Sequence, residues 1–209
     1  MDEVTTLTFV ALGDSLTYGF VPYGYTGGFG AGLPYTSYLD NLVVVELGRR
    51  ELYVDVVFVN RGVNGDTVRG MLGRLEAEVT GADYVVVWGG INDLYGGRSP
   101  GYVSEVLGSI YGRARELGVE PVGCTITSVT RRRPIVELIK EANGLIRLVC
   151  VEMDVGLVDL FGATSNEEGL LLEELSSDGM HLSGEGNRVV AETVFRDAVE
   201  GVLDGLGGQ

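Results

Sequence analysis

Five short apolar segments alternate strictly with longer segments of helical pattern, and this alternation constrains the fold more than any other feature. The apolar segments are rich in Val, Ile, Leu and aromatic residues and span residues 7–12, 52–59, 83–88, 119–126 and 155–160. The intervening and final segments predict helices over residues 34–50, 67–79, 100–117, 134–151 and 184–206. Strands that alternate with helices form parallel sheets with helices on both faces. We therefore predict an α/β fold with a five-stranded parallel sheet, in one domain over residues 1–209 because no linker or repeat interrupts the pattern.

The carboxyl ends of parallel strands lie along one edge of the sheet, which is where open α/β sheets bind ligands. Ser15 follows the first apolar segment, and the turn-rich residues 60–67 follow the second. Asn92 follows the third segment, while Asp178 and His181 come after the last and can join the same edge. Residues that are far apart in the sequence are therefore expected to share one rim.

The sequence Gly13-Asp14-Ser15-Leu16 places a hydroxyl directly after the first strand. A serine hydroxyl is a poor nucleophile at neutral pH and requires an adjacent base. Histidine is the side chain whose unperturbed pKa suits that role, and His181 is the only histidine. Asp178, three residues earlier, can accept a hydrogen bond from the ring and fix its tautomer. The alternatives are that Ser15 only caps the next helix and that His181 is an ordinary surface residue.

Acyl transfer also needs hydrogen-bond donors directed at the negative charge that develops on the carbonyl oxygen. Glycine N–H groups and asparagine amides serve as such donors, and Gly65 and Asn92 lie in the turns that follow two strands. Asn92 alone is more readily explained as a turn residue. The combination of these residues with Ser15, Asp178 and His181 on one rim favours a catalytic site.

Four sequence blocks resemble those of the SGNH, or GDSL, hydrolase family, and they occur in the order typical of that family. The blocks are Gly13-Asp14-Ser15-Leu16, Asn60 with Gly65, Gly90-x-Asn92-Asp93 and Asp178-x-x-His181. The resemblance covers nearly the whole chain. It implies a flavodoxin-like, three-layer α/β/α fold and the hydrolysis of an ester or thioester through an acyl-serine, without a metal or a cofactor.

In this resemblance, Ser15 matches the nucleophile, His181 the base and Asp178 the residue that orients the base. The family includes lipases, thioesterases, lysophospholipases and sugar deacetylases, and we expect a small or short-chain carboxylic ester or thioester as the substrate. The alternative is a non-catalytic module of flavodoxin-like fold that holds a phosphate or a nucleotide in its strand-end turns. Retention of Ser, Asn, Asp and His together favours the esterase.

The resemblance also implies an oxyanion hole formed by the Ser15 N–H, the Gly65 N–H and the Asn92 side-chain amide. Gly62 lies in the same block as Gly65 and is the second candidate for the glycine donor. The Gly-x-Ser-x-Gly signature of α/β-hydrolases is absent, because position 17 is Thr.

Residues 18–35 are rich in glycine and aromatic side chains, a composition that does not form a regular element. We expect a loop beside Ser15 in which aromatic residues such as Tyr18 and Tyr25 contact the substrate. The alternative is an irregular surface loop. Asp14, next to the candidate nucleophile, is also a candidate for contacting the substrate.

The formal net charge of −15 argues against a nucleic acid or an anionic membrane surface as a partner, because both need a basic face. Arg131, Arg132 and Arg133 interrupt this acidic character at the exit of the fourth strand. Arginine suits the recognition of carboxylates and phosphates, so these three residues are candidates for binding an anionic substrate. The alternative is that they form ion pairs with nearby Asp and Glu.

Cys124 and Cys150 are the only cysteines, which is too few for a disulfide scaffold, and with one histidine they provide no Cys/His zinc site. No apolar run approaches the ~20 residues of a membrane span. The first residues, Met1-Asp2-Glu3, are acidic where a signal peptide is basic. We therefore expect a cytoplasmic protein with a small-molecule substrate, and the sequence makes no prediction of oligomeric state.

Overall fold

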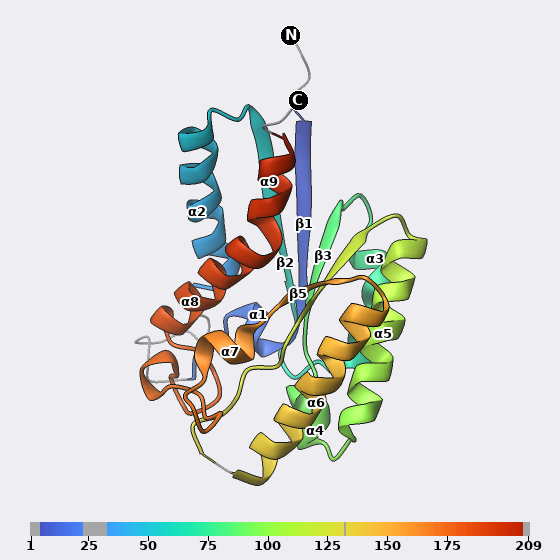
Figure 1. The fold of residues 1–209 in the computed structure, drawn as a ribbon, viewed down its shortest axis with the longest axis vertical. Coiled ribbons are helices and arrows are strands. Elements are labelled where there is room, and N and C mark those ends of the chain that lie inside the picture. Colours follow the sequence, from blue (N-terminus) through green and yellow to red (C-terminus); the bar gives the residue numbers. More distant parts are fainter. Residues whose placement is uncertain (1–4, 23–32, 132, 207–209) are drawn as a thin grey trace.

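The computed structural model describes residues 5–22, 33–131 and 133–206. Within these residues, one five-stranded sheet has the order β2-β1-β3-β4-β5, and all neighbouring strands are parallel (Figure 1). The strands are β1 (Thr5–Gly13), β2 (Val54–Gly62), β3 (Tyr84–Trp88), β4 (Glu120–Cys124) and β5 (Gly156–Val158). This order is that of flavodoxin-like folds, in which the direction of winding changes between β1 and β3. The predicted parallel sheet is therefore confirmed.

Helices cover both faces of the sheet and complete three layers (Figure 1). One outer layer consists of α2 (Tyr35–Arg50), α8 (Gly184–Val194) and α9 (Glu200–Leu206). The other consists of α3 (Val68–Glu78), α5 (Pro100–Glu116) and α6 (Arg133–Glu152). Short helices follow the carboxyl ends of three strands: α1 (Ser15–Tyr18), α4 (Ile91–Tyr95) and α7 (Leu160–Thr164). None of the helices in the described part of the chain combines the length and apolarity needed to cross a membrane.

The second half of β1 and nearly all of β3 are apolar and buried, because helices cover both of their faces. Residues 9–12 of β1 and 85–88 of β3 are each at most 3% exposed. The edge strand β2, in contrast, has several exposed or half-buried side chains. Burial of the central strands explains why their sequences read as continuous apolar runs.

The carboxyl ends of three strands are level with one another at the centre of the sheet. Gly13, the last residue of β1, pairs with Gly62 of β2 on one side and with Trp88 of β3 on the other. The residues that follow these three positions therefore emerge side by side. This register brings Ser15, the turn after β2 and Asn92 to the same part of the rim.

The observed elements differ from the predicted ones mainly at their ends. Strand β2 continues to Gly62, because its pairing with β1 continues to Gly13, so Asn60 lies in the strand and not in the turn. The predicted turn around Asn92 contains the helix α4. The predicted helix over residues 184–206 is interrupted by one π-helical segment, η2 (Phe195–Val199), between α8 and α9. The backbone stays helical at both junctions, so the direction of the chain is preserved.

Candidate active site

Ser15 begins the one-turn helix α1 at the carboxyl end of β1. Asp14 caps this helix, since its Oδ1 accepts a hydrogen bond from the Leu16 N–H at 2.9 Å. From β2, Asn60 Nδ2 donates to the Thr17 carbonyl oxygen at 2.7 Å. The turn that carries Ser15 is thus fixed both by its own cap and by the neighbouring strand.

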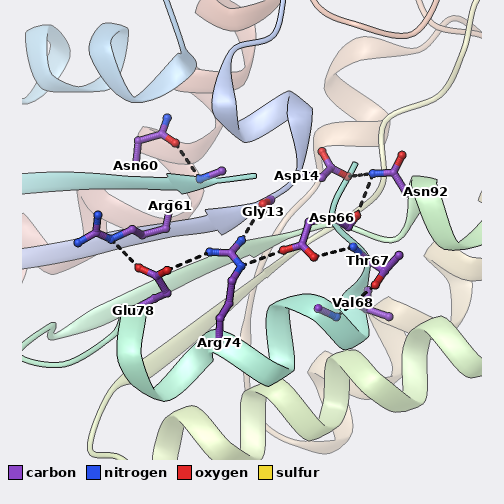
Figure 2. A network of polar contacts seen from close by, with 12 residues as sticks. Gly13, Asp14, Asn60, Arg61, Asp66, Thr67, Val68, Arg74, Glu78 and Asn92 are labelled. Atoms are coloured by element: carbon purple, nitrogen blue, oxygen red, sulfur yellow. Dashed lines mark hydrogen bonds and ion pairs between the residues drawn. The ribbon is translucent and has the colours of Figure 1, made fainter. Parts of the chain in front are cut away.

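Gly62 allows β2 to approach this turn closely. A Cβ atom at position 62 would lie 2.1 Å from the Tyr18 backbone nitrogen, which is a steric clash. The Gly62 N–H donates to Asn60 Oδ1 at 2.9 Å (Figure 2). Because this N–H already has an acceptor, Gly62 does not fit the role of oxyanion donor.

Ser15 and His181 meet across the rim, although 166 positions separate them in the sequence. The distance between Ser15 Oγ and His181 Nε2 is 3.1 Å, and the distance between His181 Nδ1 and Asp178 Oδ2 is 2.7 Å. The ring of Phe20 packs against the imidazole, with 4.7 Å between the ring centroids. The three polar side chains form a continuous hydrogen-bonded chain from carboxylate to hydroxyl.

The segment that carries Asp178 and His181 is held by its own hydrogen bonds. Asp178 Oδ1 accepts from the N–H groups of Met180 and His181, at 2.9 and 2.8 Å. The hydroxyl groups of Ser176 and Ser177 both donate to the His181 carbonyl oxygen. Partial burial acts to raise the pKa of Asp178, but hydrogen bonds from the His181 ring and from the two N–H groups outweigh it and lower this pKa below its ordinary value. Asp178 therefore stays ionised at neutral pH and accepts the hydrogen of Nδ1.

Asn92 approaches the Ser15 turn from the end of β3. Gly90 has a φ of +117°, a conformation that favours glycine, and it begins the helix α4 in which Asn92 lies. Asn92 Nδ2 donates to the Asp66 carbonyl oxygen at 2.9 Å and, less closely, to Asp14 Oδ2 at 3.3 Å (Figure 2). The amide of Asn92 is therefore directed at the residue that precedes Ser15.

Asp14 lies beneath the site with only 1% of its surface exposed. Burial, together with the smaller effect of the negative charges of Asp66 and Asp93, raises the pKa of the Asp14 carboxyl from 3.8 to about 7, although the hydrogen bond from the Leu16 N–H lowers it. The carboxyl contacts Leu16 and Asn92. The structure thus assigns Asp14 to the floor of the site and not to the surface where the sequence interpretation expected it to contact the substrate.

Arg74 of α3 connects the turn of Ser15 with the support of Asn92 (Figure 2). Its Nη2 donates to the Gly13 carbonyl oxygen at 3.0 Å, and its Nε pairs with Asp66 Oδ2 at 2.9 Å. The backbone carbonyl of the same Asp66 accepts the amide of Asn92. One guanidinium therefore contacts both the strand end that precedes Ser15 and the residue that holds the Asn92 amide.

Sequence reasoning missed Arg74. It lies on the face of α3 that also carries the buried Met71 and Leu75, so a cation within an apolar helix face was the available signal. Its partner Asp66 lies eight positions earlier in the loop before that helix. Their pairing depends on how the loop returns over the helix, which no local pattern indicates.

In the part of the chain that the structure describes, two backbone N–H groups near Ser15 have no hydrogen-bond acceptor. Gly65 lies in the turn closed by the hydrogen bond from the Asp66 N–H to the Val63 carbonyl oxygen at 3.0 Å. Within the described residues, neither the Gly65 N–H nor the Ser15 N–H has an acceptor. Both groups are thus available to bind a ligand oxygen.

The other predicted substrate contacts that the structure describes, Tyr18 and Arg131, have exposed side chains. Tyr18 is 42% exposed at the end of α1. Arg131 lies on the surface and pairs with Glu173 at 3.7 Å, as the ion-pair alternative expected. Tyr25, Arg132 and the side chain of Arg133 lie outside the described residues.

A hollow of about 570 Å³ opens beside the hydrogen-bonded chain of Ser15, His181 and Asp178, against Asp178. Polar side chains predominate in its wall, among them Tyr95 from α4, Thr130 and Arg131 after β4, and Glu173. Gly179 and Met180, which lie between Asp178 and His181 in the sequence, form the wall of the hollow next to Asp178. The hollow therefore adjoins the hydrogen-bonded chain at its carboxylate end.

A serine hydroxyl next to a histidine that is oriented by a carboxylate, with free N–H donors beside it, is the arrangement found in serine hydrolases. The chain belongs to the GDSL-like Lipase/Acylhydrolase family, whose family model matches residues 11–189. The protein is therefore an enzyme, an SGNH-type serine hydrolase with esterase activity, and not a non-catalytic binding module.

Solved structures with similar folds agree with this assignment of the fold. LAE5, an alpha/beta hydrolase enzyme from the metagenome of Lake Arreo, is 22% identical with a TM-score of 0.75, over 93% of this chain and 96% of that chain. A variant of Axe2, an acetyl xylan esterase from Geobacillus stearothermophilus, is 23% identical with a TM-score of 0.73, over 94% and 96%. The lipase/acylhydrolase from Enterococcus faecalis is 24% identical with a TM-score of 0.72, over 91% and 94%. No curated protein matches the sequence significantly.

Proposed function

We propose that the protein hydrolyses small or short-chain carboxylic esters or thioesters in two steps, with Ser15 as the nucleophile. The observation that carries this proposal is the pair of contacts from Ser15 Oγ to His181 Nε2 at 3.1 Å and from His181 Nδ1 to Asp178 Oδ2 at 2.7 Å. An ionised Asp178 only accepts hydrogen bonds, so it favours the tautomer with the hydrogen on Nδ1. His181 Nε2 then presents its lone pair to the Ser15 hydroxyl.

In the first step, Ser15 Oγ attacks the carbonyl carbon of the ester while its proton passes to His181 Nε2. The electron pair of the carbonyl double bond moves to the oxygen, which becomes an oxyanion. When this intermediate collapses, the bond to the alcohol or thiol breaks, and the leaving group takes the proton from Nε2. The free alcohol or thiol and an acyl-serine are the products.

In the second step, water attacks the carbonyl carbon of the acyl-serine and gives one proton to His181 Nε2. Collapse of the second oxyanion breaks the bond to Ser15 Oγ, which takes the proton back from Nε2. The carboxylic acid leaves, and the starting state is restored. Asp178 remains ionised throughout and stabilises the imidazolium that forms in each step.

Three donors would bind the oxyanion: the Ser15 N–H, the Gly65 N–H and the Asn92 amide. The two backbone groups have no acceptor within the described residues, which supports this role. Asn92 Nδ2 would exchange its longer hydrogen bond, the one to Asp14, for one to the oxyanion. Its bond to Asp66 would hold the amide in place during that exchange.

A small acyl group suits the surroundings of the triad. The hollow beside Asp178 has a mainly polar wall, whereas a long alkyl chain would need a continuous apolar channel. A protein of similar structure is named an acetyl xylan esterase, and this supports acetyl esters as substrates.

The test is a series of 4-nitrophenyl esters from acetate to decanoate, with the wild type and the Ser15→Ala variant. We expect activity to decline with chain length and to be absent in Ser15→Ala. A fluorophosphonate should modify Ser15, as located by mass spectrometry. Ser109→Ala, which changes an exposed serine on α5, is the matched control and should retain full activity and labelling. An adduct on another residue, or an active Ser15→Ala variant, would refute the proposed nucleophile.

A further inference from the structure

Among the basic side chains that the structure describes, two arginines have no carboxylate partner. Each basic side chain that the structure describes lies within 4.0 Å of an Asp or Glu oxygen, apart from Arg69 and Arg98. The chain has twice as many acidic residues as basic ones, 30 against 15. Carboxylates are therefore abundant enough to pair with every arginine, and a shortage of them does not explain why Arg69 and Arg98 lack a carboxylate partner.

Arg69 and Arg98 line the same hollow, which has a volume of about 310 Å³ and adjoins the site through Asn92. Thr67 and Tyr102 form other parts of its wall. The hollow is distinct from the one beside Asp178, because the two have no lining residue in common. The unpaired charges thus lie together, on the side of the site where the candidate oxyanion donor is located.

The backbone N–H of Arg98 donates to the Asp93 carbonyl oxygen at 2.9 Å, but its guanidinium donates no hydrogen bond within the described residues. Its guanidinium carbon lies 5.1 Å from the centroid of the Tyr102 ring, which is a cation–π contact. Such stacking fixes the plane of the guanidinium but leaves its N–H groups free for a ligand. This is the arrangement in which arginine binds planar or tetrahedral oxyanions through two N–H groups.

Arg69 lies where a cation lowers stability. It is the second residue of α3, next to the positive end of that helix, where negative charge is favoured. One carboxylate, Asp93, also lines the hollow; its Oδ2 accepts the Val68 N–H at 3.0 Å. No ion pair within 4.0 Å joins Asp93 to either arginine; burial raises the Asp93 pKa, although the charge of Arg98 acts to lower it. With two arginines against one carboxylate, the charged side chains that line the hollow carry a positive excess.

We infer that this hollow binds a carboxylate or phosphate group of the substrate, so that the natural ester is an anionic one. The inference rests on the proposed function, because it requires the ester carbonyl oxygen to lie at Asn92. An ester bound there would extend its charged end toward Arg69 and Arg98. In a molecule of net charge −15, this local positive field would also offset the general repulsion of anionic substrates.

The test compares anionic esters with neutral counterparts of similar size. Carboxylate on the alcohol side is examined with 4-acetoxybenzoate against 4-acetoxybenzamide, and phosphate with 4-acetoxyphenyl phosphate. Carboxylate on the acyl side is examined with the mono-4-nitrophenyl ester of adipic acid against 4-nitrophenyl hexanoate. The comparison of these pairs identifies both the preferred anion and the side of the ester that carries it.

The variants are Arg69→Gln, Arg98→Gln and the combination of both. Each single change should lower kcat/KM for the preferred anionic ester about tenfold, and the double change about 100-fold, as for the loss of one or two charged hydrogen bonds. The loss should appear as a higher KM, since the contact is present in both the bound substrate and the transition state. Activity on the neutral counterpart should stay unchanged.

Arg49→Gln and Arg113→Gln are the matched controls. They remove the same charge from the last turns of α2 and α5, which end away from the active rim. Selectivity in these controls should equal that of the wild type. Equal losses on anionic and neutral esters in the Arg69 and Arg98 variants, or no loss at all, would overturn the inference.

Calorimetric binding of 4-acetoxybenzoate and 4-acetoxyphenyl phosphate to Ser15→Ala separates this inference from the proposed mechanism, because no acyl transfer is needed. Binding of either anion should weaken in the Ser15→Ala background when Arg69 and Arg98 are both replaced. A wild type that hydrolyses none of the esters would refute the proposed function, and the calorimetry would still decide the anion site. Unchanged binding of both anions in the triple variant would refute the anion site alone.

Discussion

Replacing Asp14 by Asn should change how the stability of this protein depends on pH. The carboxyl is 1% exposed, and burial raises its pKa from 3.8 to about 7. Asparagine retains an oxygen that can accept the Leu16 N–H, so the cap of α1 is preserved while the ionisable group is removed. The variant thus isolates the effect of one buried charge.

The raised pKa of Asp14 determines whether the unfolding free energy rises or falls with pH. A pKa that is higher in the folded state means that the folded protein holds this proton more tightly than the unfolded chain does. The stabilising contribution is fully present below pH 3.8 and is lost as the pH rises through about 7. A shift of about three units corresponds to about 4 kcal/mol of unfolding free energy.

The measurement is urea unfolding between pH 4 and pH 9, followed by the fluorescence of Trp88, which is the only tryptophan and is 1% exposed. Relative to Asp14→Asn, the wild type should lose about 4 kcal/mol over this range, with no further loss at higher pH. Asp55→Asn, which changes an exposed carboxylate on β2, is the control. Its unfolding free energy should depend on pH in the same way as that of the wild type. Parallel curves for the wild type and Asp14→Asn would show that Asp14 ionises as readily in the folded protein as in the unfolded chain.

Three further variants test other parts of the site, and a salt titration tests the effect of the net charge on stability. Asn92→Ala should lower kcat roughly 100- to 1,000-fold with little change in KM, because the amide acts on charge formed in the transition state; an unchanged kcat would leave it a structural residue. Asp178→Asn should lower kcat by up to about 10⁴-fold by favouring the wrong tautomer of His181, and a loss below about tenfold would contradict this role. Arg74→Gln should lower kcat about tenfold at constant KM if it positions Asn92 through Asp66, whereas a change in KM alone would not fit. Thermal unfolding in increasing KCl should show a rising Tm, because salt screens the repulsion among the excess carboxylates; a flat or falling Tm over molar salt would contradict this.

The order and type of the main elements were predictable because the central strands are buried on both faces. Burial of this kind makes β3 and the second half of β1 apolar, and local composition then reveals them. The proximity of Ser15 to His181 was also predictable, since both follow strands whose carboxyl ends lie on one edge. The spacing of Asp178 and His181 in one short segment indicated their contact for the same local reason.

The floor of the site could not be predicted, because it depends on contacts between loops that are distant in the sequence. Asp14 looks like an exposed neighbour of the nucleophile in the sequence, but the level ends of β1, β2 and β3 enclose it. The role of Arg74 requires the loop at Asp66 to fold back over α3. The turn at Asn92 is a short helix, and Gly90 with its positive φ caps the start of that helix. A glycine in a sequence is compatible with several kinds of turn, so it does not predict this helix.

The carboxyl groups around Asn92 raise a physical problem for a site that must stabilise a negative oxygen. Ionised Asp14, Asp66 and Asp93 would all oppose the charge that develops there. The structure weakens the effect of each: burial raises the pKa of Asp14 to about 7, Asp66 pairs with Arg74, and burial also raises the pKa of Asp93, although the hydrogen bond from the Val68 N–H acts to lower it. A protonated Asp14 is also a weaker acceptor than a carboxylate, so it releases the Asn92 amide to the oxyanion more readily. The same buried proton that stabilises the fold at low pH would thus keep the oxyanion donor available, and Asp14→Asn, which is neutral at every pH, should preserve kcat at alkaline pH better than the wild type does.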